Sequence, residues 1–376
     1  MSRLLNEHRH YLADGVRLEA FARSIGEVVR PGDVVVDLGA GTGILGLMAC
    51  RAGAARVYAI DDGGMIEVAR ELADANAYGD RIVHLKGHST EVELPERADV
   101  VLADQIGHFG IEAGVLQYFA DARRRFLKPG GRFLPRRLEL NIAAVEYPEA
   151  DDLVGFWQRS AGRFDVSPVH TLAANSTYSV TMSARHLLSD GSGLAAFELG
   201  EPHEQFHADA MLSIHRPGML HGLVGYFAAS LSPSVQMTNS PAATDRIERS
   251  QLFLPIDRPI AVKDGDSVRV SLAVRPADVM MAWNVTVAHG ADTTTFRHST
   301  LQGAIMARED LQRTNPSHAP LLTAHGEAAQ TVLSLCTGTV PVREIEERIA
   351  TRFPMLFRTH RDAAAFVASL LSEHAR

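Results

Sequence analysis

The chain of 376 residues is poor in cysteine, with only Cys50 and Cys336. Two cysteines provide neither a disulfide framework nor a cysteine-based zinc site. The chain also has no excess of positive charge, because 37 lysines and arginines face 45 acidic residues and the net charge is −8. This balance argues against a protein whose main partner is nucleic acid or an anionic membrane.

Long apolar runs are also missing, so the sequence predicts no membrane-spanning helix. Residues 1–15 are polar and charged, unlike a secretory signal peptide. We therefore expect a cytoplasmic protein. The remaining composition, 46% hydrophobic and 22% charged, is that of a globular chain long enough for two or three domains.

The most informative segment of the sequence is a strand followed by alternating glycines. Val34–Leu38 contains three consecutive valines and predicts a buried strand with Asp37 near its end. Gly39, Gly41 and Gly43 follow, and a helical pattern begins directly after them. Glycines between a strand and a helix let a ligand approach the backbone, close to the free N–H groups at the helix start.

A second acidic residue completes this nucleotide-binding pattern. Residues 57–61 predict the next strand, which ends in Asp61. In βαβ nucleotide sites an acidic residue at about this distance binds the ribose hydroxyls. Residues 41–46 also spell G-x-G-x-x-G, which alone is a weak dinucleotide motif. Asp37 and Gly39 lie between the strand and that motif, and this spacing favours S-adenosylmethionine (SAM) over a dinucleotide.

The run Asp-Leu-Gly-Ala-Gly-Thr-Gly at residues 37–43 resembles the SAM loop of class I methyltransferases. The resemblance implies that Gly39, Gly41 and Gly43 line the methionine and ribose. It also implies that Asp61 holds both ribose hydroxyls and that Asp37 belongs to the cofactor-binding set.

Patterning divides the chain into three segments. Residues 1–135 alternate strands with helices, which predicts a Rossmann-like parallel sheet covered by helices. The strands expected there are Val34–Leu38, Arg56–Ile60, Arg81–Lys86, Val100–Ala103 and Arg132–Leu134, with a turn at Lys128–Gly131 before the last. Residues 136–314 predict an antiparallel barrel or sandwich, with strands at Leu138–Ala144, Leu220–Phe227, Ser267–Val274 and Trp283–Val287.

Residues 315–376 form the third segment, which follows two X-Pro steps. Three amphipathic helices are expected, at Glu327–Leu335, Val342–Ile349 and Ala363–Leu371. Three short helices in a terminal unit predict a helix-turn-helix or winged-helix module.

A narrower resemblance covers about residues 4–295. The segment His8–Arg17 resembles the N-terminal helix motif of protein arginine methyltransferases, which implies that Arg17 pairs with the SAM carboxylate. Residues 87–95, with Glu91, are similar to the segment beside the adenine. Residues 156–157, 164–166 and 221–227 resemble landmarks of that family's barrel.

Two family features are altered. The family's loop carries two glutamates that grip the substrate guanidinium, and here Asp104 stands at the first position while Ala113 stands at the second. Glu112 is displaced by one residue, and the expected histidine-tryptophan pair falls on residues 247–248, Ile-Glu. Because a planar guanidinium requires two carboxylates in a fixed geometry, these changes argue against protein arginine as substrate. Asp104 and Glu112 remain the catalytic candidates.

Histidine provides one further candidate and one rejected motif. His108 lies four residues after Asp104 and has the pKa range of a general base, although a solvated loop histidine fits the sequence equally well. His203 and His207 spell H-E-x-x-H, but a preceding glycine and proline and the strand-like surroundings argue against a helix. No metal site is predicted.

The terminal segment carries its own resemblance. Residues 333–345 look like the small helical domain of the pyrroloquinoline quinone peptide chaperone. That resemblance implies binding of a leader peptide. A packing or dimerisation appendage is the alternative.

Together these features predict a SAM-dependent methyltransferase. It is expected to act on a peptide or small metabolite, at nitrogen, in natural-product or modified-peptide biosynthesis. A non-catalytic SAM-binding adaptor and a dinucleotide-dependent oxidoreductase are the alternatives. A homodimer is left open, and neither nucleic acid nor a membrane is an expected partner.

Overall fold

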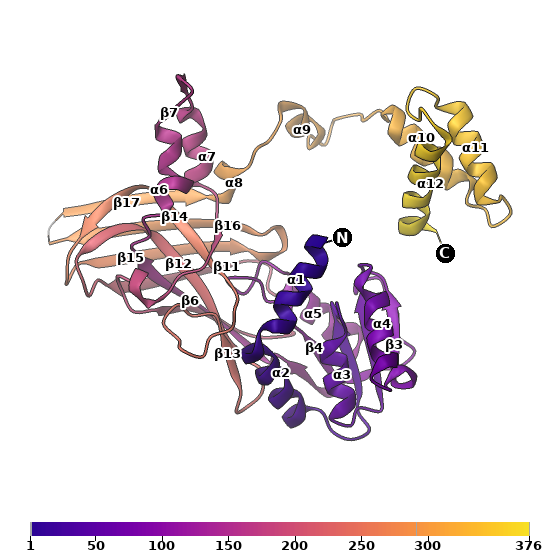
Figure 1. Cartoon of the computed structure of the whole chain (residues 1–376). Coiled ribbons are helices and arrows are strands. Elements are labelled where there is room, and N and C mark those ends of the chain that lie inside the picture. Colours follow the sequence, from indigo (N-terminus) through magenta and orange to yellow (C-terminus); the bar gives the residue numbers. More distant parts are fainter. Residues whose placement is uncertain (1, 291, 376) are drawn as a thin grey trace. The chain divides into compact units, whose positions relative to one another are not determined.

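The computed structural model describes residues 2–290 and 292–375, and it contains two compact units, residues 1–304 and 305–376. The segments 1–135 and 136–314 were predicted as separate domains, but up to residue 304 they form one unit (Figure 1). They are joined by direct bonds. Glu27 accepts hydrogen bonds from the hydroxyls of Ser232 and Ser234, more than 200 residues away.

The N-terminal half of the first unit contains a five-stranded parallel sheet. Its order is β3-β2-β1-β4-β5, with bounds β1 Val34–Leu38, β2 Arg56–Asp61, β3 Ile82–Lys86, β4 Ala98–Ala103 and β5 Leu127–Leu134. All five residues of β1 are buried, as expected for a strand in the middle of a parallel sheet. The Rossmann-like expectation for this segment is confirmed.

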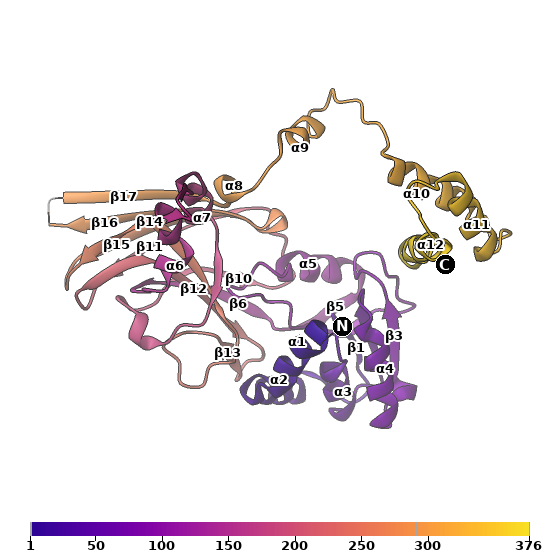
Figure 2. The same cartoon turned by 45° about the horizontal axis from the view of Figure 1, so that its top comes forward.

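Helices α2–α5 pack on this sheet, and α1 precedes them (Figure 2). Their bounds are α1 Ser2–Ala13, α2 Gly15–Val28, α3 Ile44–Arg51, α4 Met65–Ala75 and α5 Val115–Arg125. Helix α2 begins at Asp14, whose carboxylate accepts the backbone N–H of Arg17. This cap fixes the first turn of α2 and therefore the place of Arg17.

The turn predicted at Lys128–Gly131 is wrong, because these residues belong to β5. Ala98 of β4 pairs with Leu127, whereas Val100 pairs with Arg132. The extra residues between these pairs form a bulge, which accommodates the proline and glycines without ending the strand.

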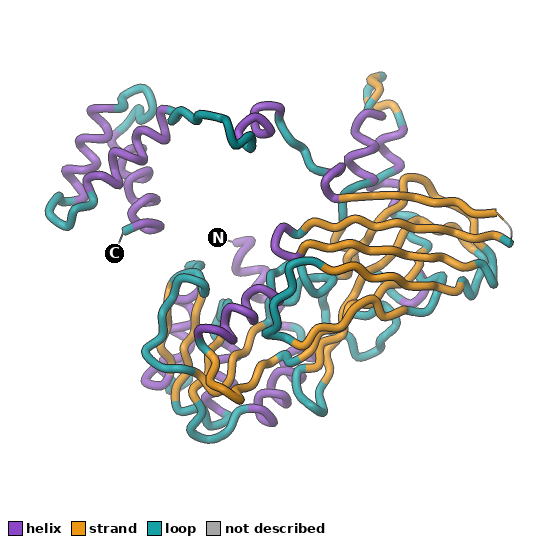
Figure 3. The backbone as a smooth tube through the Cα atoms, turned by 180° about the vertical axis from the view of Figure 1, so that it is seen from behind, coloured by secondary structure: helices purple, strands orange, loops and turns teal. Residues whose placement is uncertain are grey.

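Antiparallel sheets make up the rest of the first unit, as predicted (Figure 3). One sheet contains β6 Arg137–Val145, β9 Tyr178–Val180, β10 Ser192–Glu198, β12 Gly218–Ser230, β13 Gln236–Thr238 and β14 Gln251–Val262. The other contains β11 Phe206–Ser213, β15 Ser267–Arg275, β16 Met280–His289 and β17 Asp292–Ser299. The fully buried Trp283 of β16 donates its indole N–H to the carbonyl of Pro255 in β14, which links the two sheets.

A short excursion projects from these sheets between β6 and β9 (Figure 1). It contains α6 Ala150–Leu153, β7 Ser160–Ala161, β8 Phe164–Asp165 and α7 His170–Ala174. The short helix α8 Thr300–Gly303 follows β17. Single 3-10 turns are η1 Gly79–Arg81, η2 Gly155–Gln158, η3 Ser167–Val169, η4 Ala184–His186 and η5 Pro276–Asp278.

The second unit is helical. It contains α9 Arg308–Arg313, α10 Ala324–Leu335, α11 Val342–Arg352 and α12 His360–His374. The last three helices share a core of Ala328, Val332, Ile345, Ile349, Phe357, Ala363 and Val367. Between residues 305 and 375 the structure assigns no strand. The β-strand wing of a winged-helix module is therefore not found in these residues. Across the described residues, no helix combines the length and apolarity needed to cross a membrane.

Candidate active site

The candidate site lies where the strand order of the parallel sheet changes direction. Leu38 at the end of β1 pairs with Ile60 of β2 on one side and with Ala103 of β4 on the other. The loops that follow β1 and β4 therefore leave the same edge of the sheet together, next to Asp61. Ligands of open α/β sheets bind at this kind of edge.

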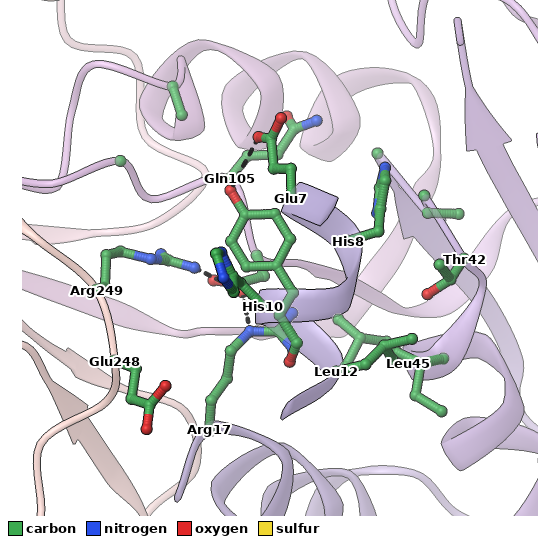
Figure 4. Close-up of a pocket in the computed structure, with 18 of the residues that line it drawn as sticks. Glu7, His8, His10, Leu12, Arg17, Thr42, Leu45, Gln105, Glu248 and Arg249 are labelled. Atoms are coloured by element: carbon green, nitrogen blue, oxygen red, sulfur yellow. Dashed lines mark hydrogen bonds and ion pairs between the residues drawn. The ribbon is translucent and has the colours of Figure 1, made fainter. Parts of the chain in front are cut away.

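A cavity of about 570 Å³ occupies this edge, and Figure 4 shows many of its residues. The loop after β1 lines one side of the cavity, the loop after β4 lines another, and helix α1 contributes Glu7, His8 and Tyr11. The third side comes from the distant segment 248–250, which leads into β14 Gln251–Val262. The cavity therefore joins the predicted cofactor loop to residues of the antiparallel sheets.

The glycine loop after β1 has a backbone path and close contacts that a side chain would disturb. Gly39 and Gly41 have φ values of 64° and 54°, a region that other residues rarely adopt. A Cβ on Gly39 would lie 2.0 Å from Nε2 of Gln105, and one on Gly41 would lie 2.8 Å from Cε1 of His8. Gly43 precedes the first residue of α3 and faces Ala69 of α4, so it does not line the cavity.

Asp61 ends β2 with both carboxylate oxygens bonded to backbone. Oδ2 accepts the N–H of Gly41 at 2.8 Å, and Oδ1 accepts the N–H of Gly63 at 2.8 Å. Asp61 also lines a smaller cavity of about 70 Å³ together with His88 and Tyr118. The carboxylate therefore holds the glycine loop in place and borders a cavity at the same time.

Asp37 lies beneath the glycine loop and does not line the cavity, which corrects its expected place in the cofactor-binding set. Its Oδ2 accepts the N–H of Gly46 at 2.9 Å and so anchors helix α3. Burial raises the pKa of Asp37 to about 7, and the nearby Asp61 adds to the increase. The N–H of Gly46 and the charge of Arg17 oppose it.

This raised pKa gives a pH-dependent stability. Between about pH 4 and pH 7 the folded chain holds a proton on Asp37 that the unfolded chain has released, so the free energy of unfolding falls as pH rises. The full effect amounts to about 4 kcal/mol. Asp37→Asn removes this titration and should flatten that slope, measured by denaturant unfolding at pH 5 and pH 8. Equal slopes in both proteins would show that Asp37 is ionised in the folded state.

Glu91 is another correction. It was expected beside the adenine, but its side chain is exposed and lines neither the large nor the small cavity. The residues of that segment that reach the small cavity are Gly87, His88 and Ser89. The strand before this segment ends at Lys86, so the positions that reach the cavity come directly after the strand end.

Asp104 lies between two arginines in the large cavity. Its Oδ2 accepts Nε–H of Arg17 at 2.5 Å and Nη2–H of Arg249 at 2.9 Å. The three side chains are 8%, 7% and 9% exposed. Burial raises the pKa of Asp104, but the two guanidinium groups outweigh burial and hold the pKa below its usual value. Asp104 is therefore an ionised carboxylate.

Arg249 is the residue that the sequence analysis missed. Its guanidinium carbon lies 5.9 Å from the ring centroids of both Tyr11 and Phe227. The only signal in the sequence was its position directly after residues 247–248, where the family's histidine-tryptophan pair was expected. The backbone N–H of Glu248 bonds Oδ2 of Asp14 at 2.8 Å, so the cap of α2 also holds this segment against the site.

Glu112 lines the cavity, but its carboxylate is also bonded to its own loop. Its carboxylate accepts backbone N–H groups from Phe109, Gly110 and Ile111 at 2.9–3.1 Å. These bonds hold the carboxylate on its own loop and support the path of that loop. A catalytic role for Glu112 stays a prediction.

His108 lines the cavity and is bonded on both ring nitrogens. Nδ1 lies 3.3 Å from the carbonyl oxygen of Ser250, and Nε2 lies 3.3 Å from Oγ of Ser179. Both partners belong to the antiparallel sheets or the segment leading into them. The geometry therefore ties the loop after β4 to these sheets, and a role for His108 as general base stays a prediction.

Comparison with known families agrees with this geometry. Residues 20–135 match a family model described as ribosomal protein L11 methyltransferase. Residues 136–289 match one described as the arginine methyltransferase oligomerisation subdomain.

Sequence relatives and solved structures cover most of the chain. Protein arginine N-methyltransferase 1.1 of Arabidopsis thaliana is 29% identical over 278 residues, 72% of this chain and 71% of that one. The probable protein arginine N-methyltransferase 1.2 of the same plant is 28% identical over 298 residues, 75% and 81% of the two chains. The Trypanosoma brucei PRMT1 enzyme-prozyme heterotetrameric complex with AdoHcy matches with a TM-score of 0.67 at 20% identity, covering 77% of this chain and 97% of that one.

A second structure, Arabidopsis thaliana protein arginine methyltransferase 10, matches with a TM-score of 0.68 at 19% identity, covering 79% and 98% of the two chains. The chain is a SAM-dependent methyltransferase of class I, as predicted. Within that class, its relatives in sequence and its neighbours in fold are protein arginine methyltransferases. The dinucleotide-dependent alternative finds no support in these matches.

Proposed function

We propose that this enzyme transfers the methyl group of SAM to a nitrogen atom of a polypeptide substrate. The observation that carries the proposal is the single cavity that joins the glycine loop to the Asp104–Arg249 pair. The relatives are named as protein arginine N-methyltransferases, which supports nitrogen as acceptor and a polypeptide over a small metabolite. The expected link to natural-product biosynthesis has no such support.

SAM supplies an electrophilic methyl group, and the chain has the residues to bind and orient it. Gly39 and Gly41 line the cavity with their backbone, and the side chains of Gln105 and His8 lie close to them. We assign the ribose hydroxyls to Asp61 and the carboxylate of the methionine part to Arg17. Helix α1 borders the cavity with His8 and Tyr11, so it is the element that would exclude water from the bound cofactor.

The direct test is methyl transfer from isotopically labelled SAM to a panel of peptides, with the modified atom located by mass spectrometry. The proposal expects label on a side-chain or backbone nitrogen. Label on oxygen, sulfur or carbon, or on none of the peptides and proteins offered, would contradict it. We also propose self-association, which the match to an oligomerisation subdomain supports, and light scattering in solution tests it.

The second unit is the candidate for holding a long substrate. Its helices bury their apolar faces in a core of their own, and every residue assigned above to the cofactor lies before residue 304. A chain ending at Ala304 should therefore bind SAM with unchanged affinity by calorimetry. If the second unit binds peptide, the KM for a long substrate should rise far more than the KM for a short one.

Two other results of that truncation are informative. An equal change in KM for both substrates would make the second unit a packing appendage. Loss of SAM binding in a soluble shortened chain would contradict both versions, because it would mean that residues 305–376 help to build the cofactor site.

A further inference from the structure

The acceptor end of the cavity has an unusual charge. One buried carboxylate, Asp104, lies between the two buried guanidinium groups of Arg17 and Arg249, so its charge is already shared by two cations before a substrate arrives. Of the other carboxylates that line the cavity, Glu112 is turned onto the N–H groups of its own loop, and Glu7 and Glu248 are exposed, where water screens them.

Two atoms of this cluster have no hydrogen-bond partner. They are Oδ1 of Asp104, an acceptor, and Nη1 of Arg249, a donor, and solvent reaches neither. Buried polar groups almost always have a hydrogen-bond partner. Two buried atoms without one in a candidate site therefore indicate a ligand that binds there. The two atoms belong to the same two groups that share the 2.9 Å bond, so an unpaired donor and an unpaired acceptor lie on neighbouring side chains.

The chemistry of these two atoms discriminates between acceptors. A guanidinium has five N–H donors and no acceptor, so it would face Nη1 of Arg249 donor to donor and add a third positive charge. A carboxamide has a carbonyl oxygen that accepts and an NH₂ that donates. It therefore matches Nη1 of Arg249 and Oδ1 of Asp104 and carries no charge.

We propose that the methyl acceptor is the carboxamide nitrogen of a glutamine or asparagine side chain, held between Arg249 and Asp104. This inference rests on the proposed function, methyl transfer to a nitrogen of a polypeptide. Tyr11 of α1 lies against the guanidinium of Arg249, with 5.9 Å between ring centroid and guanidinium carbon, and borders the same cavity.

The transfer needs only the carboxamide, SAM and the side chains of Asp104 and Arg249. The amide nitrogen forms a bond to the methyl carbon, and the carbon–sulfur bond of SAM breaks with its electron pair remaining on sulfur. Oδ1 of Asp104 takes the N–H proton, which is released to water once the product has left. Removal of this proton gives the nitrogen the electron pair with which it attacks the methyl carbon, and Arg249 stabilises the share of negative charge that develops on the carbonyl oxygen.

Binding to the full chain tests this assignment apart from turnover. Calorimetry is done with saturating S-adenosylhomocysteine, the demethylated product, and with peptides that differ only in a central glutamine, arginine or glutamate. The glutamine peptide should bind at least tenfold more tightly than the arginine peptide. Equal or tighter binding of the arginine peptide would overturn the inference and leave the proposed function intact.

Variants of Arg249 sharpen the test. Arg249→Met removes one of the two cations that hold Asp104, so the glutamine peptide should lose at least tenfold in affinity while the arginine peptide gains. Arg246→Met is the matched control, because Arg246 lies in the same segment but outside the cavity, and it should change neither. Equal weakening of all peptides by Arg249→Met would mean that Arg249 only supports the fold.

Arg249→Lys provides a second variant that keeps the charge. It should weaken the glutamine peptide, because a lysine ammonium does not reproduce the fork of donors, and it should still exclude the arginine peptide. Tight arginine binding in this variant would contradict the charge argument. Mass spectrometry of the glutamine peptide after incubation with SAM locates the methyl group. The absence of a methyl group from every peptide nitrogen would count against the proposed function itself.

Discussion

Replacing Asp61 by alanine is expected to weaken SAM binding at least tenfold in a chain that still folds. Asp61 is proposed to accept two ribose hydroxyls, and each hydrogen bond to a charged group contributes about 1.5–3 kcal/mol. The side chain also holds Gly41 and Gly63 through their N–H groups. The variant therefore loses contacts to the cofactor and the position of the glycine loop together.

Calorimetry with SAM and with its demethylated product measures this loss. Asp80→Ala is a suitable control, because Asp80 is an exposed acid in the same half of the unit and lines neither cavity. Folding is checked by circular dichroism. A folded Asp61→Ala chain with wild-type affinity would remove Asp61 from the cofactor site.

Replacing Asp104 by asparagine should have the largest effect on the free energy of unfolding. The change keeps the size of the side chain but leaves the buried guanidinium groups of Arg17 and Arg249 without their shared counter-charge. Removing one partner from a buried ion pair costs about 3–5 kcal/mol. Methyl transfer should be lost as well, because the acceptor side then has no carboxylate to take a proton.

In this variant the loss of stability can be measured separately from SAM binding, because SAM brings a carboxylate of its own. It can pair with Arg17, so SAM affinity should stay close to wild type and added SAM should recover part of the lost stability. Denaturant unfolding with and without SAM measures both. Glu96→Gln, which breaks the exposed pair with Arg56, is the control and should cost no more than about 1 kcal/mol. A stable Asp104→Asn chain with normal turnover would refute both roles.

The sequence by itself determined the cofactor half of this enzyme. The strand Val34–Leu38 was predicted to the residue, and Asp61 was placed at the end of the next strand. These features are local, because strand pattern, glycine turn and helix start depend on neighbours within a few residues. Even there, the sequence did not show which side chains are buried. Asp37 was interpreted as a cofactor contact, whereas in the structure it is buried under the glycine loop and accepts the N–H of Gly46 in α3.

The acceptor half was decided by the tertiary structure. Asp104 was singled out from the sequence, but Arg249, which lies 145 residues further along the chain, was not. No spacing rule connects two such positions, because their meeting depends on how the segment before β14 packs against the cap of α2. Glu112 shows the same limit at short range, since only the path of its loop turns the carboxylate onto its own N–H groups. Local patterns specify which elements form. The register and packing of distant elements specify which charges meet, and in this enzyme those charges decide what the site can accept.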